Sequence, residues 1–490
     1  MITKVNSMSK CPNIVFILTD QQRRDTIAAH GFDYMDTPHL DSLVKGGTSF
    51  MNMYVTAPSC APSRASLFTG TYPHTNGVYR NDEIWSWTWV TLLNQAGYRC
   101  INVGKMHTNP FEADFGFHER HVVENKDRDS PNLPFFLDQW DKALWKRGIE
   151  KPSRVTYRRR EDYKDRLGAF LWEADEDLHA DVFVADLACM WLDRYSREEP
   201  FFLQVGMPGP HPPYDPTEEY VQKYSNRELP KAIRNYDFDS QPYPLRKLRE
   251  NHLDQDHDGI VHLSEPTEEQ LHRQRAYYYA NVSMIDTQVG KIIAALTQRG
   301  VIDNTIIVFT SDHGDCLNDH GHSQKWNMYE QSVHVPAIVW GPDVKQNQRI
   351  ENFTAHFDLG PTVLEAAGVT APSWMEARSL WPELRGDDFA GREVVFAEHA
   401  NDKILQHTGF MTMIRRDRWK LVHFVDCQDG QLFDLDEDPD EINNLWDSHN
   451  HSKIKQDLIL EILSWRIESD KITQGFLLYL KNPTVEGMGR

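Results

Sequence analysis

Short apolar segments rich in β-branched residues recur along the first three quarters of the chain, with longer stretches of helical pattern between them. A strand that is buried on both faces gives such a continuous apolar run, and parallel strands need helical connections. The alternation therefore predicts an α/β fold in which a large, mostly parallel sheet is sandwiched by helices. The segments assigned to this sheet are 13–19, 99–103, 201–207, 305–310 and 336–340.

Beyond about residue 372 the pattern changes to short alternating runs separated by polar turns, which favours a small antiparallel sheet. The runs are 393–398, 409–415, 418–424 and 431–434, and residues 454–467 have the apolar spacing of a helix packed on that sheet. We therefore predict an α/β domain over residues 1–372 and a smaller C-terminal α+β domain over 373–470. Residues 471–490 are expected to form a tail that reaches another subunit of a homo-oligomer.

The 490-residue chain has a formal net charge of -21. Such a field repels polyanions, so we expect no nucleic-acid partner, and an anionic substrate would need a local positive pocket. No segment approaches the roughly 18 uninterrupted apolar residues of a membrane span, and the N-terminus shows no signal-peptide core. We therefore expect no membrane partner and a cytoplasmic location, or a periplasmic or secreted one if a leader has been removed.

Polar side chains follow four of the predicted strands at the point where each strand ends. In an open α/β sheet the carboxyl ends of the strands carry the chemistry, because loops there can present polar groups without breaking the ladder. One such residue alone is common in loops, but four endings together indicate a site. The residues are Asp20 and Gln21, Lys105 and His107, His211, and Asp312 with His313.

Two kinds of chemistry are present in this set. Asp20, Gln21, Asp312 and His313 would supply mainly oxygen ligands, which suit a hard divalent cation such as Ca²⁺, Mg²⁺ or Mn²⁺ better than zinc. A second group would supply positive charge and proton donors for a tetrahedral oxyanion, and so could form the local positive pocket. This group is Arg64, Lys105, His107, His211 and Lys325.

The stretch from Ser59 to Gly70, Ser-Cys-Ala-Pro-Ser-Arg-Ala-Ser-Leu-Phe-Thr-Gly, closely resembles the signature of type I, formylglycine-dependent sulfatases of the alkaline phosphatase superfamily. Gly-Lys-Met-His at 104–107, His211 ahead of a proline and Ser-Asp-His-Gly at 311–314 match in the family's order. Leu-Phe-Asp-Leu at 432–435 resembles the C-terminal domain of that family. The resemblance covers residues 13 to about 463.

The resemblance implies that the enzyme hydrolyses sulfate esters of a carbohydrate or a small organic molecule. It implies that a maturation enzyme oxidises Cys60 to formylglycine, whose hydrated aldehyde is the nucleophile. Arg64 and Lys105 would hold the formylglycine and sulfate oxygens, His107 would accept a proton from the sulfated diol, and His211 and Lys325 would protonate the departing alcohol. One divalent metal, with Ca²⁺ expected first, would bind Asp20, Gln21, Cys60, Asp312 and His313.

Two positions depart from the commonest family pattern, because many members have Asp where this chain has Gln21 and Asn where it has His313. An Asp-His pair at 312–313 also resembles carbohydrate sulfatases and phosphonate monoester hydrolases. A phosphonate monoester or phosphodiester hydrolase is therefore the alternative activity, and a catalytically silent binding protein with this fold is a third hypothesis. Asn81 is a candidate contact to the ester group, although an Asn in a turn is more often structural.

Two further motifs have competing interpretations. Residues 254–265 match the spacing of an EF-hand loop, so a second, structural Ca²⁺ at Asp254, Asp256, Asp258 and Glu265 is one hypothesis and a solvated acidic loop is the other. The proline at 266 opposes an exiting helix and favours the acidic loop. A basic run over 154–166 could bind further sulfates on a polymer, but acidic residues within the run favour a solvated face.

Overall fold

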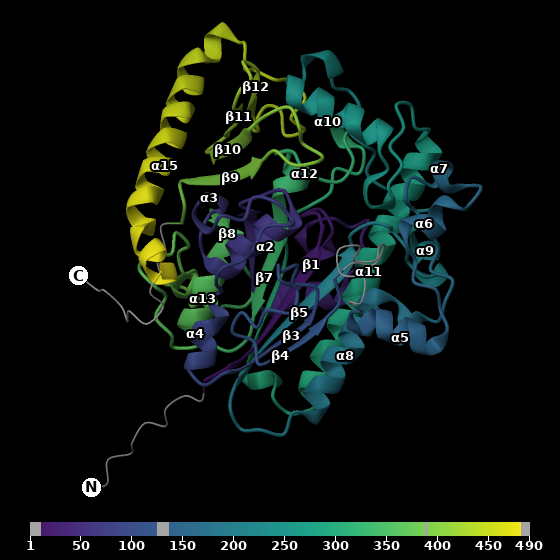
Figure 1. Cartoon of the computed structure of the whole chain (residues 1–490), viewed down its shortest axis with the longest axis vertical. Coiled ribbons are helices and arrows are strands. Elements are labelled where there is room, and N and C mark those ends of the chain that lie inside the picture. Colours follow the sequence, from purple (N-terminus) through teal and green to yellow (C-terminus); the bar gives the residue numbers. More distant parts are fainter. Residues whose placement is uncertain (1–10, 125–136, 388–390, 482–490) are drawn as a thin grey trace.

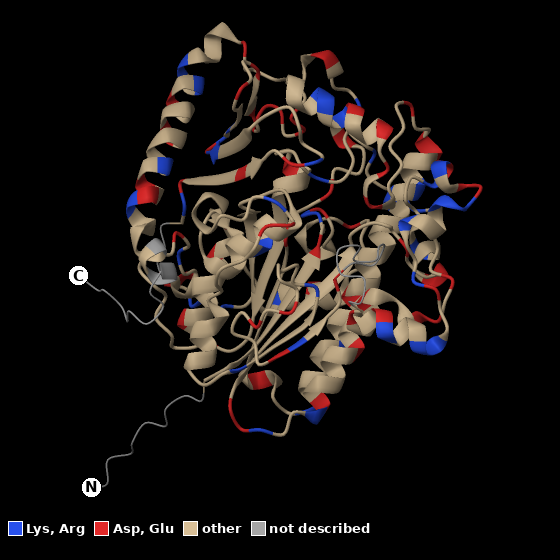
Figure 2. Ribbon diagram, in the orientation of Figure 1, with Lys and Arg blue, Asp and Glu red and all other residues tan. Residues whose placement is uncertain are grey.

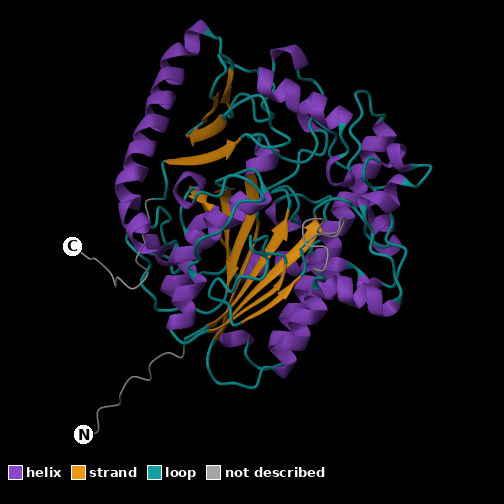
Figure 3. Ribbon diagram, viewed as in Figure 1, coloured by secondary structure: helices purple, strands orange, loops and turns teal. Residues whose placement is uncertain are grey.

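The computed structural model describes residues 11–124, 137–387 and 391–481. Its centre is an eight-stranded sheet in the order β4-β3-β5-β1-β6-β7-β2-β8, which confirms the predicted α/β class (Figures 1 and 3). Strand β7 pairs antiparallel with both β6 and β2, and the other pairings are parallel. The strands are β1 (Asn13–Asp20), β2 (Thr48–Tyr54), β3 (Arg99–Gly104), β4 (Glu119–Val122), β5 (Phe201–Pro210), β6 (Thr305–Ser311), β7 (His334–Trp340) and β8 (Gln348–Ala355).

Strand β1 shows why helices cover both faces of this sheet. Its side chains alternate between the two faces, so Phe16 lies in one buried cluster and its neighbours Val15 and Ile17 lie in another. The first cluster includes residues of α2 (Cys60–Thr69), α4 (Val90–Gln95) and α13 (Leu359–Ala366). The second includes residues of α1 (Pro38–Gly46), α5 (Gln139–Arg147), α8 (Ala180–Arg194) and α11 (Glu268–Gln298).

The remaining helices lie in the connections. Part of the polar stretch between β4 and β5 forms α6 and α7, where charged residues of both signs gather at the right of the molecule (Figures 1 and 2). The long helix α11 begins with the capping box that Thr267 and Gln270 form. The other helices are α3 (Pro73–Asn76), α6 (Arg154–Arg158), α7 (Tyr163–Arg166), α9 (Glu218–Tyr224), α10 (Tyr243–Asp254), α12 (Glu330–Val333) and α14 (Trp381–Leu384).

The C-terminal region forms the predicted antiparallel sheet, in the order β12-β11-β10-β9. A single helix, α15 (Ser452–Lys481), lies along it, so the helix predicted over 454–467 continues through the first part of the expected tail; residues 482–490 lie outside the described residues (Figure 1). None of the helices in the described ranges is long and apolar enough to cross a membrane. The strands are β9 (Val394–Ala400), β10 (Phe410–Arg416), β11 (Trp419–Phe424) and β12 (Gly430–Asp434).

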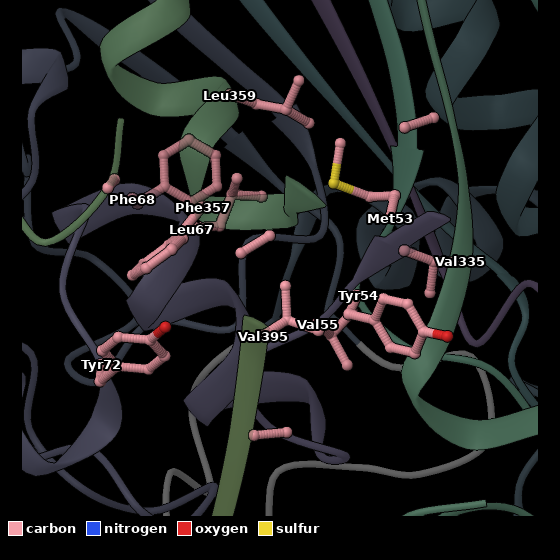
Figure 4. Close-up of a cluster of buried hydrophobic side chains, with 14 of the residues drawn as sticks. Met53, Tyr54, Val55, Leu67, Phe68, Tyr72, Val335, Phe357, Leu359 and Val395 are labelled. Carbon is pink, nitrogen blue, oxygen red and sulfur yellow. The ribbon is translucent and has the colours of Figure 1, made fainter. Parts of the chain in front are cut away.

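A continuous apolar cluster joins the small sheet to the large one. Figure 4 shows Val395 of β9 facing Val55, with Met53 of β2 and Val335 of β7 nearby. Phe357, which is fully buried, packs against Tyr72 with ring centroids 4.8 Å apart. Burial of this kind stabilises at roughly 25 cal/mol per Å² of apolar surface. The two sheets therefore share one core cluster.

Candidate active site

The strands that end in the predicted polar residues lie side by side. Strands β3, β5, β1 and β6 are consecutive in the sheet and parallel, so their carboxyl ends meet at one edge. This arrangement places Asp20, Lys105, His211 and Asp312 at a single location. The sheet topology alone explains why residues nearly 300 positions apart meet.

Helix α2 brings residue 60 to this edge. Cys60 is the first residue of the helix, and Arg64 lies one turn later on the same face. Both side chains are buried, and Cys60 is 1% exposed. The left-handed conformation of Gly70, with φ 70°, ends the helix and lets its N–H donate to the carbonyl of Ser66 at 2.8 Å.

Arg64 links helix α2 to the ends of three strands, β1, β3 and β6. Its Nε donates to Oδ2 of Asp312 at 2.7 Å, and its Nη2 donates to Oδ2 of Asp20 at 3.2 Å. A third bond runs from Nη1 to the carbonyl oxygen of Lys105 at 2.9 Å. The Nζ of Lys105 itself lies 2.5 Å from Oδ2 of Asp20. The planar guanidinium thus fixes the relative positions of the segments that carry Asp20, Lys105 and Asp312.

Four of the five predicted metal ligands gather in one cluster. One ligand atom from each of Asp20, Cys60, Asp312 and His313 lies within 4.8 Å of the others, and all four residues are buried. The Nδ1 of His313 lies 3.0 Å from the carbonyl oxygen of Gly314, so Nδ1–H donates there and Nε2 presents its lone pair to the cluster. The cluster can hold a divalent metal ion, and its two carboxylates are the part of the donor set that suits a hard cation.

The fifth predicted ligand, Gln21, takes part in a hydrogen-bond chain. Its Oε1 accepts from Nζ of Lys325 at 2.8 Å, and its Nε2 donates to Oδ2 of Asp315 at 2.7 Å. Tyr214 also donates its hydroxyl to Oδ2 of Asp315, at 2.6 Å. These bonds fix the orientation of the Gln21 amide, with its oxygen toward the site.

Charged side chains of both signs meet at this edge. Asp20 and Asp312 pair with Arg64, Asp20 also pairs with Lys105, and the ammonium group of Lys325 lies against Cys60. Burial alone would raise the pKa of Asp20, but these cations and His211 outweigh it and hold that pKa well below its usual range. Burial raises the pKa of the Cys60 thiol to about 11, with Asp20 as the next contribution. Arg64, Lys105 and Lys325 are therefore the cations that an anionic substrate would meet here.

The two predicted acid-base histidines are held differently. The Nδ1 of His211 lies 2.7 Å from the carbonyl oxygen of Pro212, and its Nε2 lies 3.8 Å from Oδ2 of Asp258. The backbone N–H of His107, at a φ of 62°, donates to both carboxylate oxygens of Glu124, at 3.2 and 3.1 Å. Burial raises the pKa of Glu124. Each histidine therefore lies beside a carboxylate that was not predicted to belong to the active site, Asp258 beside His211 and Glu124 beside His107.

Asn81 lies at the start of the nucleophile helix. Its Oδ1 accepts from the backbone N–H of Ala61 at 3.0 Å and from the hydroxyl of Ser59 at 3.3 Å. Since Ser59 makes no side-chain capping bond of its own, Asn81 satisfies one of the free N–H groups of α2 from another segment. The predicted contact between Asn81 and the ester group stays a prediction.

The EF-hand-like loop is engaged with the basic run. Asp256 accepts from Nε of Arg158 at 2.7 Å, and Asp258 pairs with Arg154. Among the described residues, ligand atoms are closely grouped in the Asp20 cluster and not in this loop. Asp254 ends α10, and the next long helix, α11, begins at Glu268. The geometry gives no support to a second calcium here and favours the acidic-loop interpretation.

Sequence reasoning missed three buried carboxylates of the site. Asp315 follows His313 by two residues, so its proximity to the Asp-His pair was the available signal. Glu124 lies in a stretch that the sequence shows only as a polar excursion from the sheet, and Asp258 was considered only as a ligand in the EF-hand-like loop. Their positions depend on contacts that form in the folded chain.

A model of the sulfatase family matches residues 12–369, and a model described as the C-terminal region of N-sulphoglucosamine sulphohydrolase matches residues 318–468. An arylsulfatase of Clostridium perfringens is 28% identical over 93% of this chain and 94% of its own length. A choline-sulfatase of Rhizobium meliloti is 30% identical over 89% of this chain and 82% of its own length.

Solved structures resemble the whole chain. A phosphonate monoester hydrolase of Agrobacterium radiobacter superposes with a TM-score of 0.79 at 25% identity, covering 94% of this chain and 96% of that one. A protein in complex with its substrate D-glucosamine-2-N,6-O-disulfate has a TM-score of 0.74 at 23% identity, covering 95% and 99%. The second likeness is one of fold alone.

Proposed function

The chain belongs to the sulfatase family, and from this premise we propose that it hydrolyses sulfate esters of a carbohydrate or small organic molecule with residue 60 as formylglycine. Its enzyme class is that of the sulfuric ester hydrolases. The observation that carries the proposal is the convergence of Arg64, Lys105 and Lys325 around residue 60. Two of these cations pair with Asp20 and Asp312, and together with Lys325 they would offer positive charge to an anionic substrate in a chain of net charge -21.

Residue 60 is positioned for nucleophilic attack. A hydrated formylglycine offers one hydroxyl for attack on sulfur and a second hydroxyl whose deprotonation expels the sulfate and restores the aldehyde. In the structure, the side chain of residue 60 lies 2.9 Å from Nζ of Lys325 and 3.2 Å from Nε2 of His313. His107 would accept the proton of the second hydroxyl from the β3 side of the site. An unmodified thiol lacks the second hydroxyl.

Asp20, Gln21, Asp312, His313 and residue 60 would hold one divalent cation, with Ca²⁺ proposed first and Mn²⁺ or Mg²⁺ as alternatives. When bound, the cation lowers the pKa of the attacking hydroxyl and compensates charge on the sulfate oxygens. The contribution of the protein is preorganisation. Arg64 already fixes Asp20 and Asp312, so these carboxylates need little rearrangement to act as ligands.

The cationic side chains match the sulfate group. A sulfate monoester has three non-bridging oxygens that all need donors, and Arg64, Lys105 and Lys325 supply them. His211 and Lys325 would donate a proton to the departing alcohol. A maturation enzyme that oxidises Cys60 is the partner that this scheme requires.

The alternative activity is hydrolysis of phosphonate monoesters or phosphodiesters with the same nucleophile. The likeness to the Agrobacterium radiobacter hydrolase over almost the whole chain favours it. A diester offers fewer free oxygens, however, and would leave part of the buried cationic cluster unpaired. We therefore place sulfate monoesters first.

The test is a comparison of kcat/KM for a matched aryl sulfate, aryl phosphonate and aryl phosphodiester, followed by sulfated saccharides. The protein should first be shown by peptide mass spectrometry to carry formylglycine at residue 60. We expect the sulfate to be the best substrate. A consistent preference for the phosphorus esters would overturn the sulfatase proposal and leave the nucleophile in place.

A further inference from the structure

Two motifs that the proposed chemistry does not use meet in the folded chain. The basic run on α6 lies against the acidic loop after α10, and the charged residues pair one to one. Arg154 pairs with Asp258, and Arg158 pairs with Asp256. Neither motif needs an external ligand to explain its charge.

Apart from their arginine partners, the carboxylates of Asp256 and Asp258 have different neighbours. Asp256 accepts a bond from the hydroxyl of Tyr163 at 2.6 Å and lies at the surface, with 26% of its side chain exposed. Asp258 is buried, and its Oδ2 lies 3.8 Å from Nε2 of His211. One carboxylate is therefore part of the surface and the other faces the active site.

The ring of His211 has a defined orientation. Its Nδ1 lies 2.7 Å from the carbonyl oxygen of Pro212, an acceptor only, so Nδ1 carries a proton in either charge state. The other nitrogen, Nε2, is the atom that can gain or lose a proton, and it is the atom that faces Asp258. A carboxylate at this distance favours the protonated ring.

We propose that Asp258, held in place by Arg154, is a positioning residue that keeps His211 ready to donate its Nε2 proton to the departing alcohol. This inference rests on the proposed function. A hydroxyl oxygen of the hydrated formylglycine at residue 60 forms a bond to sulfur as the bond between sulfur and the ester oxygen breaks; the electron pair of the broken bond goes to the ester oxygen, which takes the proton from Nε2. The imidazolium becomes neutral imidazole, with its remaining proton on Nδ1.

Charged groups of both signs act on His211. Asp20 and Asp258 favour the protonated ring, whereas Lys325 and Lys105 oppose it. In the free enzyme, burial and these lysines hold the pKa of His211 well below its usual range. A bound sulfate ester adds negative charge beside the lysines and so offsets their effect, while Asp258 continues to favour the protonated form.

The variant that tests this role is Asp258→Asn. Asp258 has a φ of 53°, and Asn tolerates this left-handed conformation, so the loop should keep its shape. The matched control is Asp256→Asn, which removes the same charge from the same loop but not from the side of His211. Thermal unfolding of both variants should show that they remain folded.

The readout is the dependence of the rate on the leaving group. The aryloxide of an aryl sulfate leaves without much help from an acid, whereas the alkoxide of an alkyl or sugar sulfate needs the proton. We expect Asp258→Asn to lower kcat by roughly 10²-fold for the alkyl sulfate and less than about 10-fold for the aryl sulfate. The basic limb of the pH–kcat profile should also move to lower pH. Asp256→Asn should change neither.

Equal losses on both substrates, with an unmoved pH profile, would show that Asp258 has a purely structural role and would overturn the inference. The same would follow if Asp256→Asn gave the same leaving-group dependence. Failure of the proposed function is distinguishable, because it would appear in the wild-type enzyme as a preference for phosphorus esters. In that case the ratio of alkyl to aryl rates, measured on phosphonate esters, still decides the role of Asp258.

Discussion

The Nζ atom of Lys325 lies 2.9 Å from Sγ of Cys60, although 265 residues separate the two in the chain. The contact places a buried ammonium group directly against the side chain that we propose to be oxidised to formylglycine, whose hydrated aldehyde is the nucleophile. Its second bond, to Oε1 of Gln21 at 2.8 Å, ties the lysine to the end of β1. The two contacts together hold the side chain of Lys325 beside residue 60.

Active protein should contain formylglycine, and not cysteine, at position 60. Cys60→Ser keeps one hydroxyl but lacks the second hydroxyl needed to expel sulfate, so we expect steady-state turnover to fall by at least roughly 10³-fold. Peptide mass spectrometry of the variant after incubation with substrate should show a sulfated serine. Full turnover by protein that contains only intact cysteine at position 60 would exclude the mechanism.

Asp312→Ala should lose both the divalent metal and the activity. The change removes a ligand and also leaves the guanidinium of Arg64, whose Nε donates to Asp312 at 2.7 Å, without that partner. Breaking a buried ion pair in this way costs about 3–5 kcal/mol of stability. Metal content by mass spectrometry, with His313→Ala as a second ligand variant, separates loss of metal from loss of fold. Retention of metal and rate in both variants would contradict the ligand assignment.

Substitutions of Asn81 can separate its two candidate roles. If its main role is to accept the N–H of Ala61, the Asn81→Asp variant should keep that role, because a carboxylate is favourable at a helix N-terminus. If the amide nitrogen also binds the ester, Asn81→Asp should raise KM. We expect Asn81→Ala to lose about 1 kcal/mol of stability and Asn81→Asp to retain it. Equal stability of Asn81→Ala and wild type would exclude the capping role.

Asp286 should make the folded state less stable as the pH rises. Burial raises its pKa to about 7, against an ordinary value of 3.8, while its carboxylate accepts the N–H of Leu40 at 2.7 Å. A carboxyl group with a raised pKa in the folded state contributes stability that is fully present below about pH 4 and is lost as the pH rises through about 7. Urea unfolding of wild type and Asp286→Asn between about pH 5 and 8 measures this effect. As the pH rises, the free energy of unfolding of Asp286→Asn should increase relative to that of the wild type. A difference between the two that stays constant with pH would contradict the prediction.

The core cluster between the two sheets should be essential for stability. Phe357 is 0% exposed, so Phe357→Ala should cost about 3–5 kcal/mol through lost burial and the cavity that remains. Leu460→Ala on α15 is the control, because that side chain is 60% exposed and its loss should change stability by less than about 0.5 kcal/mol. Chemical denaturation measures both. Similar effects of the two changes would show that the cluster does not join the sheets energetically.

The sequence predicted best the positions of the site residues that directly follow a buried strand. Asp20, Lys105, His211 and Asp312 follow buried strands, and residues in that position meet wherever the strands are parallel neighbours. The strands that were not predicted, β2, β4 and β8, carry a weaker signal. Strand β8 lies at an edge of the sheet and has several exposed or half-buried residues among its buried ones, while β4 has only four residues. The antiparallel direction of β7 has no signature in its own composition.

The roles of Glu124 and Asp258 could not be predicted in the same way. A carboxylate in a polar stretch has no pattern that reveals its partner. Asp258 and the acidic residues near it in the sequence fit the spacing of a calcium-binding loop. Its partners in the structure, however, are Arg154 and His211, which come from two other segments. Such residues acquire a function only from tertiary contacts.

The near-complete burial of residue 60 has a consequence for the order of events in the cell. With 1% of its surface exposed and a helix beginning at its own position, Cys60 cannot enter the active site of another macromolecule once the chain has folded. On the mechanism that we propose, its oxidation would therefore have to precede folding. Maturation and folding would then compete for the same nascent molecule, and chains that fold first would keep an unmodified cysteine. The yield of active enzyme would be a kinetic ratio, which slower synthesis or more maturation enzyme should raise without any change in the sequence.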